Sequence, residues 1–75
     1  MKDFTYKILL RPEPEGGFTV LVPSLSGCIT YGETVEESIK MAKEAISLYL
    51  EELQDRGEEI PEEQSMFKYN LKIAV

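Results

Sequence analysis

Residues 28–38 read CITYGETVEES, and their pattern predicts that the chain passes here from a short strand into a long helix. Gly32 ends the strand, and Thr34 stands three residues before Glu37, which is the spacing of a capping box. In that arrangement the threonine oxygen accepts an orphan backbone N–H and the glutamate reaches back to the cap. The adjacent acidic side chains also suit the positive end of the helix dipole. We therefore predict that a helix begins at Val35.

The predicted helix runs from Val35 to about Arg56, and Gly57 is its C-terminal stop. At about 100° per residue, most of its apolar side chains form one stripe that would face a sheet. A smaller apolar flank lies beside the stripe, and the sequence leaves open whether it packs inside the chain or forms a contact patch. The flank consists of Met41, Ala45 and Leu48, and the stripe consists of Val35, Ile39, Ala42, Ile46, Tyr49, Leu50 and Leu53.

Four segments around this helix have the two-residue alternation of half-buried strands. Residues 4–11 alternate first, and a loop rich in proline and glycine then leads to a second strand over 18–22. A short third strand covers 28–31, and residues 66–75 show the cleanest alternation of all. The expected fold is a two-layer α+β arrangement, β-β-β-α-β, in which one helix packs on a mostly antiparallel sheet. We expect one domain over 1–75.

A single helix covers only one face of such a sheet. The other face is polar on the first and last strands but still carries four apolar side chains. Edge strands also need a partner or protection, and a chain of 75 residues buries only a modest share of its surface. We therefore expect a homo-oligomer, a dimer or higher. The four apolar residues are Leu9, Leu21, Cys28 and Ala74.

The residue types that usually carry catalysis are scarce. Histidine is absent and Cys28 is the only cysteine, which excludes the commonest general base and any multi-cysteine metal site. Cys28 has no neighbouring base to activate it, so we interpret it as a small apolar side chain in the sheet. Four pairs of adjacent glutamates lie on the helix and its loop, where neighbouring side chains point apart. We predict no enzymatic activity, no catalytic or metal-binding residues and no cofactor.

The charge is concentrated in one segment. The net charge is −6, and residues 33–63 hold eleven acidic and three basic residues. Such a segment attracts a basic partner and repels nucleic acid, which requires a basic footprint for binding. The sequence shows no secretion signal and no long apolar run. We therefore expect a cytoplasmic protein that binds neither membranes nor nucleic acid directly.

Three pieces of the sequence together resemble the HicB-type antitoxin family, the HicB-like domain of type II toxin–antitoxin systems. They are GFTVLVPSLSGCITYGETVEES at 17–38, AKEAISLYL at 42–50 and GEEIP at 57–61. The resemblance implies a partial ribonuclease-H-like fold without the catalytic carboxylates. It also implies a domain that binds and blocks a small, basic HicA-type toxin, which cleaves mRNA. Ser26 and Ser38 replace the proline and alanine that are usual in the family.

Many members of that family carry a C-terminal DNA-binding domain, and this sequence shows none, so we do not expect this chain alone to repress its operon. From the resemblance we expect an antitoxin that neutralises its toxin by direct contact. The alternative is a solitary HicB-like interaction or scaffold domain that forms oligomers and has no toxin partner. Interfaces commonly combine an apolar centre with a charged rim, which favours the helix flank and its acidic side. The expected contact residues are Met41, Glu44, Leu48, Glu51 and Glu52.

Overall fold

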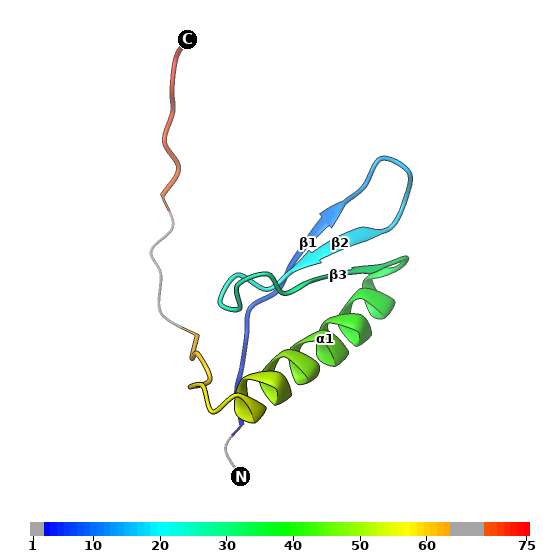
Figure 1. Cartoon of the computed structure of the whole chain (residues 1–75). Helices are drawn as coiled ribbons and strands as arrows, with labels where there is room; N and C mark the ends of the chain where they lie inside the picture. The colour runs from blue at the N-terminus through cyan, green and yellow to red at the C-terminus, as the bar shows by residue number, and fades with distance from the viewer. Residues whose placement is uncertain (1–2, 64–68) are drawn as a thin grey trace.

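The structure is a computed structural model that describes residues 3–63 and 69–75. Within these ranges three antiparallel strands form one sheet in the order β1-β2-β3, and helix α1 lies along one face of it (Figure 1). This arrangement confirms the expected two-layer α+β fold. Helix α1 does not combine the length and apolarity needed to cross a bilayer. The elements are β1 (Leu9–Pro12), β2 (Phe18–Leu21), β3 (Ile29–Gly32) and α1 (Val35–Asp55).

The strand register assigns the side chains to the two faces of the sheet. Val20 pairs with Leu10 on one side and with Thr30 on the other, and its side chain is fully buried. Residues directly opposite one another share a face, so this row lies on the helix side. The neighbouring row toward the end of β2 lies on the opposite face of the sheet, and all of its residues are apolar. This outer apolar row consists of Leu9, Leu21 and Ile29.

The core closes around a tight turn after β2. Leu25 N–H donates to Val22 O over 3.0 Å, and Cys28 N–H donates to Leu25 O over 3.0 Å, which folds the turn inward. The three side chains form a buried cluster. The sequence places Cys28 on the open face of the sheet. This prediction is wrong, because the turn places Cys28 in the core just before β3. Half-buried side chains from the first segment and from α1 pack against the cluster: Tyr6, Ile8, Ala45, Ile46, Tyr49 and Leu50.

Helix α1 begins and ends as predicted. Thr34 Oγ1 accepts from Glu37 N–H over 3.0 Å, and the Glu37 carboxylate accepts from Glu33 N–H over 2.9 Å. The carboxylate thus reaches one residue further back than the usual capping box. At the other end Gly57 has a φ of 72°, and the N–H of Glu58 donates across it to the last helical turn. This pattern is a Schellman motif, in which glycine supplies the left-handed residue.

The buried side of α1 is rotated relative to the predicted stripe. Ala42 is buried as expected, but Val35 and Ile39 are exposed and Ser38 is fully buried. The reason is the close approach of β3, because a Cβ on Gly32 would lie only 2.5 Å from the Cα and nitrogen of Ser38. Only a small side chain fits there. The larger apolar neighbours in the first two turns therefore point outward.

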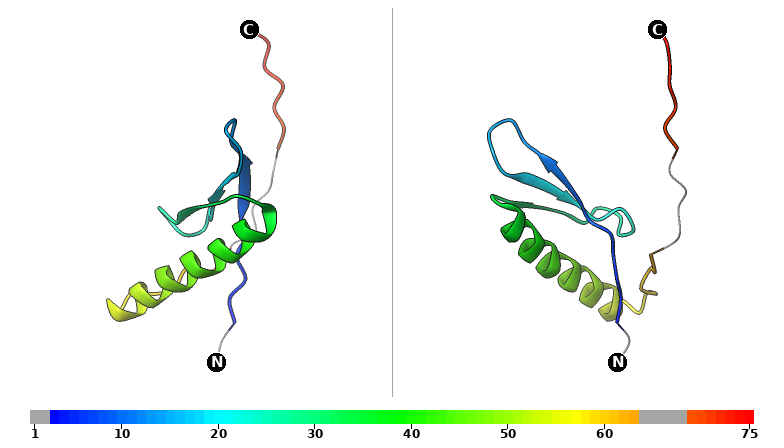
Figure 2. Two further views of the ribbon diagram at one scale, coloured as in Figure 1. Left: turned by 90° about the vertical axis from the view of Figure 1, so that its right-hand side faces the viewer. Right: turned by 180° about the vertical axis from the view of Figure 1, so that it is seen from behind.

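Both predicted outer strands differ from the structure. Residues 4–8 keep the predicted alternation of half-buried and exposed side chains, but strand pairing begins only at Leu9, opposite the end of β2. The predicted fourth strand is not in the sheet: residues 69–75 belong to no strand and are exposed, and 66–68 lie outside the described residues. An alternating segment becomes a strand only beside a partner edge, and Figures 1 and 2 show 69–75 running away from the sheet and the helix.

Candidate partner interface

The five predicted contact residues lie together on one side of α1. Met41 and Leu48 are seven residues apart, as are Glu44 and Glu51, so each pair is nearly aligned along the helix axis. Met41 is half-buried, whereas Leu48 is 67% exposed and the three glutamates are exposed. We call this strip the α1 flank. It consists of Met41, Glu44, Leu48, Glu51 and Glu52.

The structure divides the apolar flank that the sequence left unassigned. Ala45 packs against the core cluster, and Met41 is half-buried beside it. Leu48 instead borders a shallow surface depression that also involves Lys43, Glu44 and Ser47. Ala45 therefore packs inside the chain, whereas the side chain of Leu48 is exposed to solvent.

Acidic groups surround this exposed leucine. The carboxylates of Glu44, Glu51 and Glu52 lie on the same side of α1. Two ion pairs in the described part of the chain, Arg11–Glu13 and Arg56–Glu58, lie elsewhere in the molecule. An exposed apolar side chain with charged neighbours matches the composition of a protein–protein contact surface.

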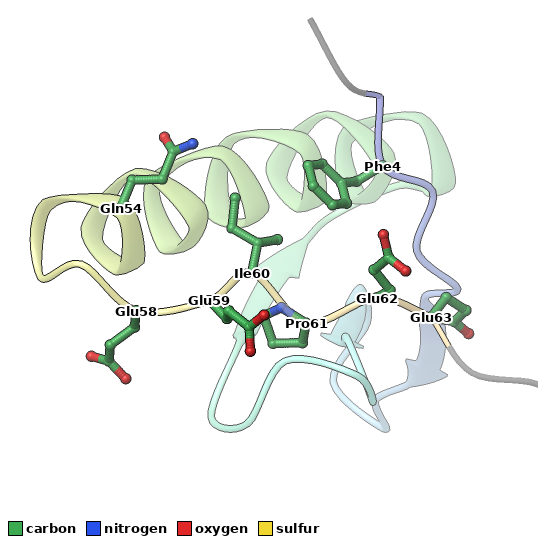
Figure 3. A pocket seen from close by; sticks show the side chains of 8 residues that line it. All are labelled: Phe4, Gln54, Glu58, Glu59, Ile60, Pro61, Glu62 and Glu63. Atoms are coloured by element: carbon green, nitrogen blue, oxygen red, sulfur yellow. The ribbon is translucent and has the colours of Figure 1, made fainter.

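A second feature, which the sequence reasoning missed, is an acidic hollow beside the end of α1. Figure 3 shows Phe4 and Ile60 on the side near α1, with Glu58 and Glu59 directed away from it. The Tyr6 hydroxyl donates to the carbonyl oxygen of Pro61 and so ties the two segments together. This contact spans 55 residues of sequence, and no local signal could have predicted it. The lining residues are Phe4, Gln54, Glu58, Glu59, Ile60, Pro61, Glu62 and Glu63.

Glu63 anchors one end of this hollow. Its Oε1 accepts from Ser24 Oγ over 2.6 Å and from Lys7 N–H over 3.3 Å. These hydrogen bonds, first the one from Ser24, lower the pKa of Glu63 below its ordinary value. Burial, and then the charges of Glu62 and Glu63, raise the pKa of Tyr6. The hollow is therefore negatively charged at neutral pH, which opposes binding of phosphate backbones.

Within 3–63 and 69–75, no group of three or more acidic or cysteine side chains is placed to hold a metal ion. Cys28 is free and buried, and burial raises the pKa of its thiol. A thiol with a raised pKa is a poor nucleophile, so Cys28 fits the packing role predicted for it.

Comparison with known proteins adds a family context. Residues 6–73 match the model of a family described as the HicB-like antitoxin of bacterial toxin–antitoxin systems. A UPF0150 protein of Synechocystis sp. is 38% identical over 65 residues, which cover 87% of this chain and 82% of that relative.

Two relatives carry the antitoxin name itself. Antitoxin HicB 1 of Photorhabdus laumondii is 34% identical over 61 residues, which cover 81% of this chain and 39% of that protein. Antitoxin HicB of Escherichia coli is 42% identical over 41 residues, which cover 55% of this chain and 30% of that protein. The similarity thus spans less than half the length of these two antitoxins.

Proposed function

This chain belongs to the HicB-like antitoxin family, and we propose that it is an antitoxin that neutralises a small, basic, mRNA-cleaving toxin of the HicA type by direct contact. The role is that of a non-enzymatic binding protein, and its place of action is the cytoplasm. The observation that carries the proposal beyond family membership is the α1 flank, where an exposed leucine is bordered by three exposed glutamates.

The charge distribution supports a basic partner. Residues 33–63 contain eleven acidic and three basic residues, and they include all of α1. An RNA-cleaving toxin needs a basic surface to hold its substrate. The acidic segment can attract that surface from a distance, and Leu48 can then anchor the complex at short range. The antitoxin would in this way compete with RNA for the same basic surface.

The second candidate function is a solitary HicB-like scaffold domain that assembles with copies of itself. One observation favours it: the outer apolar row of Leu9, Leu21 and Ile29 lies on the sheet face that α1 does not cover. Such a surface suits self-association and requires no toxin.

Co-expression with the small basic protein encoded next to this chain tests the proposal. We expect a stable complex on size-exclusion chromatography with light scattering, together with relief of growth arrest caused by the toxin. A homo-oligomer that ignores its neighbour and leaves growth arrested would instead favour the scaffold function.

A matched pair of variants tests the α1 flank. Leu48→Glu introduces a charge at the centre of the flank, and Ile39→Glu makes the same kind of change at an exposed leucine-sized side chain on another part of α1. We expect Leu48→Glu to weaken toxin binding by about 30-fold or more, as loss of a central anchor does, while Ile39→Glu binds normally. Circular dichroism checks that both variants fold. A folded Leu48→Glu protein that binds as tightly as wild type would remove the flank from the interface.

A further inference from the structure

Residues 69–75 carry an apolar side that this chain leaves uncovered. Tyr69, Leu71 and Ile73 are 77–82% exposed, and Val75 is fully exposed. The intervening Asn70, Lys72 and Ala74 occupy the opposite side of the extended segment. Four large apolar side chains in alternation form a contiguous strip, and a soluble protein rarely leaves such a strip in water.

A complementary strip lies along the first segment of the chain. Residues 4–10 alternate in the same way, and their even-numbered side chains are only half-buried. Tyr6 and Ile8 already pack against the core cluster, so this strip lies at the border of the core. The four side chains are Phe4, Tyr6, Ile8 and Leu10.

The backbone beside this strip offers an open strand edge. Glu13 N–H donates to Gly17 O across the hairpin, so the odd-numbered residues of β1 direct their N–H groups toward β2. The even-numbered residues direct theirs outward, where the sheet order β1-β2-β3 places no further described strand. Pro12, which lacks an N–H, falls on this outward side and leaves the β1–β2 pairing intact.

We propose that a second copy of this chain adds its residues 69–75 as a strand along this open edge, beside residues 4–10. The apolar side of the added strand packs against the half-buried strip, and two copies exchange these segments about a two-fold axis. Seven residues of strand span roughly 23 Å, which matches the seven residues of 4–10.

The course of residues 69–75 indicates that the added strand comes from a second copy. The Glu63 carboxylate accepts from Lys7 N–H and Ser24 Oγ, so it caps the end of the β1–β2 ladder. Figures 1 and 2 show residues 69–75 directed away from the sheet of their own chain, so a strand added at this edge comes from another copy.

The proposal predicts the mass of the 75-residue chain in solution. Light scattering after size-exclusion chromatography should give about twice the 8.5 kDa of one chain. Leu71→Glu/Ile73→Glu places two charges on the apolar side of the segment and should halve that mass. Asn70→Glu/Ala74→Glu adds the same charge to the opposite side and should keep the mass of the dimer. The toxin is absent from this experiment, so its failure would leave the antitoxin role untouched.

Amide hydrogen exchange provides the second readout. The amides of Tyr6, Ile8 and Leu10 should be protected in wild type and in Asn70→Glu/Ala74→Glu, and should lose protection in Leu71→Glu/Ile73→Glu. A monomeric wild type would overturn the proposal. So would a dimer that survives Leu71→Glu/Ile73→Glu. If that dimer dissociates on Ile29→Glu, the outer apolar row is the true interface.

Discussion

Gly32 controls how closely the sheet and the helix approach each other. It ends β3 and lies against Ser38 in the first turn of α1, where a Cβ would come within 2.5 Å of backbone atoms. Backbone atoms cannot move aside as the tip of a flexible side chain can. The helix must therefore shift away from the sheet to admit even one methyl group.

We expect Gly32→Ala to lower the free energy of unfolding by about 2–3 kcal/mol, as overpacking of a tight contact does. Urea unfolding at a fixed protein concentration measures the change. Gly27→Ala is the control, because Gly27, unlike Gly32, has room for a Cβ, although it requires a φ of 77°. That substitution should cost only about 1 kcal/mol through backbone strain. Equal losses in the two variants would show that the close approach is unimportant.

Thr34 and Ser38, both at the start of α1, differ in how far the sequence alone could predict their roles. The cap at Thr34 was predictable, because a capping box joins residues only three apart in sequence. The burial of Ser38 was not predictable. Periodicity assigns hydrophobic side chains to the buried side of a helix, whereas this position requires a small side chain. The hydroxyl of Ser38 donates a hydrogen bond to Thr34 O over 2.7 Å, so it is paired although it is buried.

Among the elements, the segment over 60–63 acts as a clasp that holds the start of the chain. Tyr6 bonds to Pro61, and Glu63 joins Lys7 to Ser24. The folded chain lowers the pKa of Glu63 below its ordinary 4.5, which means that folding favours the charged carboxylate. The stabilisation is therefore fully present above the unfolded pKa and is lost as pH falls through the lower, folded pKa.

We expect Glu63→Gln to reduce stability most at pH 7, and the difference from wild type to shrink as the pH falls below about 4.5. Urea unfolding between pH 3 and 7 measures this. Glu13, whose pKa is lowered by hydrogen bonds from Thr19 and Arg11, keeps part of the acid dependence in the variant. Glu51→Gln removes a carboxylate from the exposed side of α1 and serves as control. A difference in the free energy of unfolding between Glu63→Gln and wild type that stays constant from pH 3 to 7 would show that the charged Glu63 carboxylate does not stabilise the fold.

Element boundaries were predictable where local signals set them. Helix α1 begins at Val35 and ends at Asp55 because a threonine cap and a glycine stop flank it. The ends of strands depend on their partners instead. Residues 4–8 alternate like a strand but do not pair with β2, because β2 ends at Leu21, opposite Leu9. Residues 69–75 alternate like a strand too, and periodicity alone could not reveal that they lie outside the sheet.

At the scale of the whole molecule, charge and apolar surface are divided between different regions. The acidic side chains concentrate on α1 and the hollow beyond it, whereas the outer sheet face and residues 69–75 are largely apolar. The distribution of charges along the sequence predicted the acidic segment, and helical periodicity predicted the α1 flank. The hollow needed the fold, because Phe4 and Ile60 meet only after the chain has doubled back. The surfaces proposed for a toxin and for a second copy of the chain therefore do not overlap.

This division predicts how association with the toxin responds to salt. Glu44→Lys/Glu51→Lys reverses two charges on the α1 flank, and Glu15→Lys/Glu59→Lys reverses two exposed charges elsewhere, so both variants have the same net charge. If the flank steers the toxin, its reversal should lower the association rate constant by about tenfold at low salt and flatten its salt dependence, with a smaller effect on dissociation. Stopped-flow mixing at several ionic strengths measures both rates. Equal slowing in the two variants would show that the net charge of the molecule attracts the toxin, and that the flank has no special part in the encounter.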